Sequence, residues 1–170
     1  MDESIRSILE GLKKAIETET NGYHFYMMAA KSTQDPKGRE AFETLASEEQ
    51  KHEQFLRTQY RSVIENGSVD PKVKLGPRAS FEGSSPIFSE EIRGRIKDAH
   101  YEMTALSIGI QLELSSIDFY KDEAEATDNP DVRKFYLELA DWETGHYEAL
   151  LRQHDLLKED YWSAARFAPF

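Results

Sequence analysis

Two stretches of the chain place apolar residues at alternating steps of three and four, which is the spacing of one face of a helix. The first stripe covers residues 5–30, and a second stripe with the same steps covers residues 99–124. Each stripe is followed by a break at a proline, Pro36 in one case and Pro130 in the other, which cannot continue a helix. Apolar residues recur at the same spacing after each proline, so each half of the chain is predicted to form two helices joined by a short turn.

The two halves are related copies of one unit. Aligned without gaps at an offset of 94 residues, residues 16–59 and 110–153 are identical at 14 of 44 positions. Agreement of this kind indicates a tandem duplication. We therefore expect a single domain over residues 1–170, with repeat one at about 5–59 and repeat two at about 99–153.

Four helices with apolar seams predict an all-α, ferritin-like four-helix bundle built from two helical hairpins. The segment between the repeats, about residues 60–98, is long enough to run the length of the bundle, which would make the second and third helices parallel. Ser89 precedes two glutamates and is a candidate cap for a further short helix. The C-terminal tail, residues 158–170, contains four aromatic residues and is expected to pack on the bundle or on a second subunit.

Composition narrows the range of functions. A formal charge of −11 repels phosphate backbones and anionic lipids, so neither nucleic acid nor a membrane is an expected partner. The chain has no cysteine, which excludes a disulfide framework and thiolate chemistry, and any metal must bind His, Asp or Glu. The first residues lack the uninterrupted apolar core of a secretory signal, and we expect a cytoplasmic location.

Charged and titratable residues occupy positions that the stripes assign to the interior: Glu19, Glu49, His52, Glu113, Glu143 and His146. Buried carboxylates lose solvation and repel one another unless protons or cations neutralise them. Each Glu-x-x-His pair places a carboxylate and an imidazole one helical turn apart, where one cation can bind both. Two divalent cations would balance the four carboxylates, and iron or manganese suits such ligands, with zinc as a further candidate. The alternative is that these six residues face solvent, which would require the predicted buried face of every helix to be wrong in the same way.

At these residues the sequence resembles the ferritin-like superfamily, and specifically the rubrerythrin-like di-iron proteins, over roughly Ile5–Leu157. The segments that carry the resemblance include AIETETNGYHFYMMAAKSTQDP and FYLELADWETGHYEALL. It implies two iron ions that react with hydrogen peroxide or dioxygen, and a homodimer. It also implies the ligand roles, in which two glutamates bridge the metals and two Glu–His pairs are terminal: Glu49 and Glu143 as bridges, Glu19 with His52, and Glu113 with His146.

Two departures from that family pattern bear on function. Rubrerythrins carry a cysteine-ligated rubredoxin module, and because this chain has no cysteine, an external donor protein would have to supply electrons. Rubrerythrins also carry a glutamate three residues after the third-helix ligand, where this chain has Ser116. The remaining set resembles a bacterioferritin ferroxidase centre as well. A ferroxidase that oxidises Fe(II) for storage or detoxification therefore stays an alternative, and a metal-stabilised interaction module without turnover is a second one.

Further residues have candidate roles close to the six. Tyr26 and Tyr120 lie two turns beyond Glu ligands on the same face, so they are candidate catalytic residues that bond ligands or relay protons and electrons, with structural packing as the alternative. Glu48 is expected to face solvent, and Trp142 is expected to pack in the core. Gly145 is expected either to be a neutral substitution that the helix tolerates or to make room for a close neighbour. The remaining histidines are expected at the periphery: His24, His100 and His154.

Overall fold

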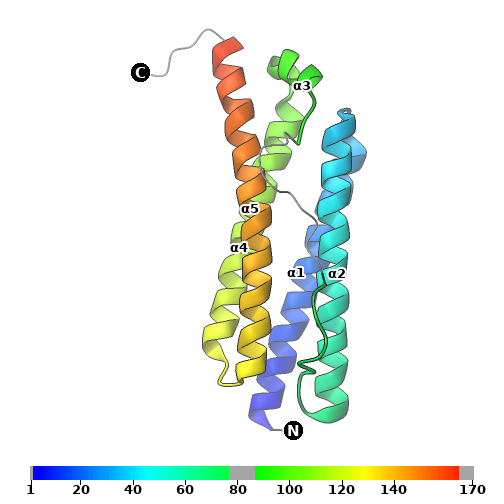
Figure 1. Cartoon of the computed structure of the whole chain (residues 1–170), viewed down its shortest axis with the longest axis vertical. Helices are drawn as coiled ribbons and strands as arrows, with labels where there is room; N and C mark the ends of the chain where they lie inside the picture. The colour runs from blue at the N-terminus through cyan, green and yellow to red at the C-terminus, as the bar shows by residue number, and fades with distance from the viewer. Residues whose placement is uncertain (1, 77–86, 165–170) are drawn as a thin grey trace.

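The computed structural model describes residues 2–76 and 87–164, and the predicted all-α bundle is confirmed. Its elements are α1 (Glu3–Ser32), α2 (Pro36–Asn66), α3 (Glu90–Gly94), the 3-10 turn η1 (Ile96–Asp98), α4 (His100–Ala126) and α5 (Pro130–Ala164). Helix α1 packs along α2, and α4 packs along α5, so the chain forms two antiparallel hairpins laid side by side (Figure 1).

The turns between paired helices form where the sequence predicts them. The Asp35 side chain accepts a hydrogen bond from the Gly38 amide at 2.8 Å and caps α2, which begins at Pro36. In the second hairpin the Asn129 side chain accepts from the Val132 amide at 3.1 Å. Both repeats thus turn in the same way, with an Asx side chain satisfying amides that a helix start leaves without partners.

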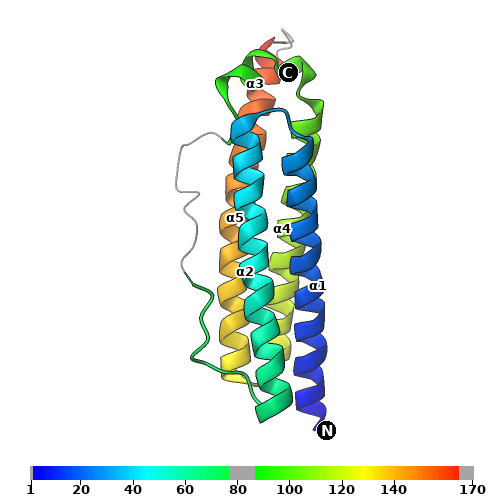
Figure 2. The ribbon, with the colours of Figure 1, turned by 90° about the vertical axis from the view of Figure 1, so that its right-hand side faces the viewer.

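The long crossover makes α2 and α4 parallel, as predicted, while α1 and α5 run the other way (Figure 2). Matching glutamines of the two repeats hold its two ends. Gln59 accepts from the Asp70 amide at 2.8 Å and donates to its carbonyl at 3.0 Å, and Gln153 accepts from the Ile87 amide at 2.9 Å. The crossover is therefore fixed to α2 at one end and to α5 at the other.

Two details differ from the expectations for the ends of the elements. The predicted short helix begins at Glu90, but the Ser89 hydroxyl donates to the Asp35 carboxylate and does not cap it. Helix α5 continues through Ala164, so the first half of the expected tail is helical and Tyr161 packs against the core. The last six residues of that tail lie outside the described part of the chain.

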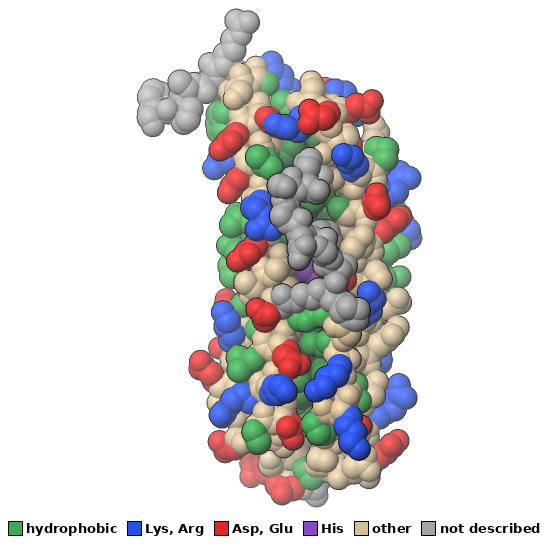
Figure 3. All heavy atoms as spheres, in the orientation of Figure 1, with side chains coloured by type: hydrophobic (Ala, Val, Ile, Leu, Met, Phe, Trp, Pro, Cys, Tyr) green, Lys and Arg blue, Asp and Glu red, His purple; other side chains and the backbone are tan. Residues whose placement is uncertain are grey.

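The core has two apolar layers separated by a polar one. Leu12 and Leu139 are fully buried in one layer, and Leu106 and Leu150 are fully buried in the other. Each such leucine stabilises the fold by about 1.5–3 kcal/mol, which offsets the cost of polar groups between the layers. Charged side chains of both signs are spread over the face drawn in Figure 3. Within the described ranges, no helix has the length and apolar character needed to cross a bilayer.

Candidate metal centre

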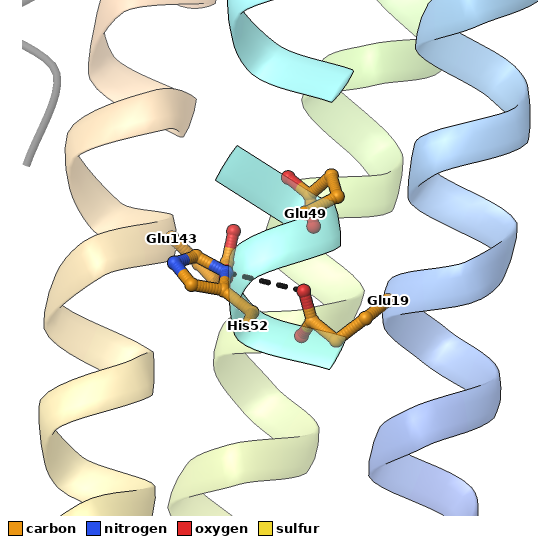
Figure 4. A group of neighbouring side chains, drawn as sticks. All are labelled: Glu19, Glu49, His52 and Glu143. Carbon is orange, nitrogen blue, oxygen red and sulfur yellow. Dashed lines mark hydrogen bonds and ion pairs between the residues drawn. The ribbon is translucent and has the colours of Figure 1, made fainter. Parts of the chain in front are cut away.

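All six residues that the sequence assigned to the interior are buried, and none is more than 4% exposed. Helices α1 and α4 each provide one glutamate, and α2 and α5 each provide a Glu-x-x-His pair. They form two groups, in each of which possible ligand atoms lie within 4.8 Å of one another: Glu19, Glu49, His52 and Glu143, and Glu49, Glu113, Glu143 and His146. Figure 4 shows the first group directed toward a common point from three helices. Glu49 and Glu143 belong to both groups, which matches the bridging positions that the resemblance implies.

Both histidines direct Nδ1 toward the carboxylates. His52 Nδ1 lies 3.1 Å from Glu19 Oε2 and 3.0 Å from Glu143 Oε1. His146 Nδ1 lies 3.1 Å from Glu143 Oε2 and 3.4 Å from Glu49 Oε1. The two rings are nearly parallel, with centroids 6.0 Å apart. Each imidazole therefore presents one nitrogen to a set of oxygens, which is the donor combination that iron, manganese and zinc accept.

The cluster strongly perturbs its own titration. Burial, and then the neighbouring carboxylates, raises the pKa of Glu49 well above its usual value and that of Glu113 to about 8. Burial disfavours a charged imidazole, yet Glu143 and Glu19 outweigh it and raise the pKa of His52 to about 9. Burial likewise opposes ionisation of Glu143, but the two histidines lower its pKa well below the usual value. In the absence of bound cations, protons held by the imidazoles and by some of the carboxylates must balance the negative charge of this buried cluster.

Two buried oxygens in this cluster lie near a histidine nitrogen but form no well-aligned hydrogen bond with any described residue. They are Glu49 Oε1 and Glu143 Oε1, and both are buried. A buried carboxylate oxygen without a partner costs free energy, unless a cation or a proton satisfies it. The shared glutamates are the two that have such an oxygen, so the donor set fits a pair of divalent cations.

The two candidate tyrosines contact the cluster across the hairpins. The Tyr26 hydroxyl on α1 donates to Glu113 on α4, and the Tyr120 hydroxyl on α4 donates to Glu19 on α1. Burial, and then the nearby carboxylates, raises the pKa of both tyrosines well above the usual value, so both stay protonated donors. Because α1 and α4 run in opposite directions, each tyrosine reaches the glutamate of the other repeat. Their catalytic role stays a prediction.

The expectation for Glu48 was wrong. This residue is 1% exposed, and its Oε2 lies 2.6 Å from Nε2 of His146 on α5. The Glu48 side chain lies on a different face of α2 from Glu49, as expected, but that face packs against the neighbouring helix α5 and is not exposed to solvent. Trp142, which aligns with Glu48 at the 94-residue offset, is buried as expected and packs edge-on against His52 with ring centroids 4.9 Å apart. An apolar residue at the aligned position was the sequence signal that Glu48 is buried.

The profile of the Rubrerythrin family matches residues 10–154. The chain belongs to the rubrerythrin family. A search of solved structures found a hypothetical protein from Pyrococcus furiosus that is 28% identical, with a TM-score of 0.55, covering 89% of this chain and 90% of that one. The search of curated proteins returned no match. Family membership supports a ferritin-like, di-iron type of protein.

The remaining predictions concern two small residues close to this rubrerythrin-type cluster, Ser116 and Gly145, and the three peripheral histidines. Ser116 donates to the Leu112 carbonyl at 3.1 Å and so binds its own helix. Its counterpart in α1 is Gly22, where an added Cβ would lie 3.2 Å from Glu49 Oε2, so the missing side chain leaves room for that carboxylate. A Cβ at Gly145 would meet nothing within 4 Å, so this glycine admits no close neighbour. The three peripheral histidines are exposed or partly exposed and lie outside both groups.

Proposed function

We propose that this protein is a non-haem di-iron oxidoreductase that reduces hydrogen peroxide, or dioxygen, with electrons from an external donor protein. The observation that carries the proposal is the pair of buried donor groups that share Glu49 and Glu143. Family membership supports the di-iron character of the site. The charge balance agrees, since two divalent cations would neutralise four carboxylates.

In this proposal Glu19 and His52 would hold one iron, Glu113 and His146 would hold the other, and the two shared glutamates would contribute to both positions. The chemistry supplied by a ferrous pair at this site would be the transfer of two electrons to peroxide, which with two protons gives two water molecules. The tyrosine hydroxyls hold the terminal carboxylates in orientation, because each donates to one of them. Flanking apolar layers keep bulk water away from the ligands.

The proposal of an external electron donor is based on the lack of cysteine in this sequence. Re-reduction of the oxidised site needs electrons, and the 170 residues include no cysteine that could hold an iron–sulfur cluster or a rubredoxin-type iron. We therefore propose a separate redox protein as the source of electrons.

A ferroxidase is the second candidate, and Ser116 is the observation that favours it. The hydroxyl of this residue bonds its own helix, so the position offers no additional carboxylate to the site. The six remaining donors are symmetric between the repeats, as in a bacterioferritin-like centre. In this case Fe(II) would be the substrate, and the reaction would need no donor protein.

The first test combines metal analysis with anaerobic iron loading. Protein purified without a chelator should contain about two metals per chain. The Fe(II)-loaded protein should be oxidised on mixing with peroxide, and further turnover should need added reductant. Continued oxidation of excess Fe(II) without a donor would favour the ferroxidase. Metal-dependent stability with no optical change on addition of peroxide or oxygen would refute both reactions and favour the interaction module.

A matched variant tests the bridging assignment. Replacing both Glu49 and Glu143 with alanine should abolish binding of a metal pair, because each residue belongs to both donor groups. The control replaces exposed Glu43 and Glu148 with alanine, which removes two charges from the same two helices, α2 and α5. Two metals retained in the double bridging variant would contradict the assignment.

A further inference from the structure

The two repeats place different residues behind the two histidines. Glu48 and Trp142 occupy matching positions, each directly before a shared glutamate. Glu48 contacts His146, and Trp142 contacts His52. The six donors are therefore symmetric, but their surroundings are not.

His146 has a fixed orientation in the structure. Its Nε2 lies 2.6 Å from Glu48 Oε2, while its Nδ1 faces the carboxylates of the cluster. When a cation displaces the proton from Nδ1, the hydrogen bond from Nε2–H to this carboxylate satisfies the remaining proton and holds the ring in place. The ring already has the orientation that a metal ligand needs, and its Nε2–H keeps an acceptor once a cation replaces the proton on Nδ1.

His52 has no such acceptor. Its Nε2 is buried and has no hydrogen-bond partner among the described residues, and the edge-on ring of Trp142 packs against the imidazole. Its Nδ1 contacts Glu19 and Glu143, so in the metal-free protein the proton is best placed on Nδ1. A cation at this position must displace that proton to bind Nδ1, and the Nε2–H then formed lacks an acceptor.

We propose that the two metal positions are inequivalent, and that Glu48 is a positioning residue that makes the Glu113–His146 position fill first. The inference rests on the proposed di-metal site. Loss of an outer hydrogen bond of this kind costs about 10–100-fold in metal affinity in other proteins. We expect the two positions to differ in affinity by a factor in that range.

The test is a titration of the metal-free protein with Co(II), followed by optical absorption in competition with a chelator. Wild type should bind two ions in two resolved steps, whose dissociation constants differ about 10–100-fold. The Glu48→Leu variant should lose the tighter step, so that both ions bind with similar affinity. Glu48→Gln keeps an acceptor oxygen and should retain the order. The control Trp142→Phe keeps an aromatic ring beside His52 and should leave both steps resolved.

A second readout concerns the tautomer directly. In the Zn(II)-loaded wild type, the ¹⁵N chemical shifts of His146 should show a protonated Nε2 whose hydrogen bond is absent in Glu48→Leu. This measurement on wild type keeps the proposal testable even where the leucine variant does not fold. A deprotonated His146 Nε2 in wild type would overturn the proposal.

Each outcome separates the inference from the proposed function. Two equal binding steps in wild type would overturn the inequivalence and leave the di-metal site in place. A Gln variant that behaves like the Leu variant would also overturn it, because charge alone would then explain the effect. Absence of any Co(II) binding would refute the di-metal site itself.

Discussion

The metal-free protein should lose stability as the pH rises from about 6.5 to about 9. His52 carries the largest part of this argument, because its pKa is raised from 6.5 to about 9 by Glu143 and Glu19. A raised pKa means that the folded state holds the proton more tightly than the unfolded chain. The stability contributed by this proton is complete below pH 6.5 and is lost as the pH rises through 9.

The size of the loss follows from the shift. A change from 6.5 to about 9 corresponds to about 3 kcal/mol, at 1.36 kcal/mol for each pH unit. Glu113 acts in the same direction, because its raised pKa of about 8 favours a folded state that still binds a proton after the unfolded chain has lost it. Glu143, with its lowered pKa, stabilises above pH 4.5 and loses that contribution only as the pH falls, outside this window. For a domain of this size, 3 kcal/mol corresponds to a fall in Tm of about 6–12 °C.

The assay is thermal denaturation at several pH values, with chelator or with two equivalents of Zn(II). Metal ligands must be deprotonated, so the stabilisation by Zn(II) should grow over the same pH range in which the metal-free protein weakens. His100→Gln is the control, because this histidine is exposed at the start of α4 and its loss should leave the profile unchanged. A metal-free Tm that is constant or rises between pH 6.5 and 9 would refute the account of the buried cluster.

Two further predictions use small changes inside the bundle. Gly145→Ala should raise the unfolding free energy by about 1 kcal/mol through helix propensity, whereas Gly22→Ala gains the same propensity but presses its Cβ on Glu49 and should weaken metal binding. Calorimetry with and without Zn(II) compares the pair, and equal behaviour of the two variants would contradict the role of Gly22. Tyr120→Phe removes the donor to Glu19 and should lower the unfolding free energy by about 1–3 kcal/mol, measured by denaturant unfolding. An unchanged midpoint and slope would show that this bond contributes nothing to stability.

The sequence was sufficient to predict the fold and the convergence of the six donors, because both depend on helical periodicity. Glu19 and Glu113 fall on apolar stripes, and a polar residue on such a stripe must lie inside the bundle. The duplication added a second, independent copy of the same pattern. Turn positions were equally accessible, since Asp35 and Asn129 precede prolines in both repeats.

The contacts between helices could not be read from one helix at a time. Glu48 lies beside Glu49 on α2, and helical phase alone places it off the ligand face. Whether that direction meets solvent or another helix depends on where α5 lies, and only the packed structure shows Glu48 against His146. Likewise, helical spacing placed Tyr26 near the ligands without indicating which one it bonds, and the antiparallel packing of α1 and α4 directs it to Glu113.

Neither hairpin completes a metal position alone. The group around His52 takes Glu19 and Glu49 from the first hairpin but needs Glu143 from the second, and Tyr120 of the second hairpin bonds Glu19. A separated hairpin would therefore hold only part of each donor group, and its inner apolar face would be exposed to water. The polar layer makes the two repeats depend on each other in a way that apolar layers of leucine would not. Duplication followed by divergence at Glu48 and Trp142 could then change one metal position without dismantling the other.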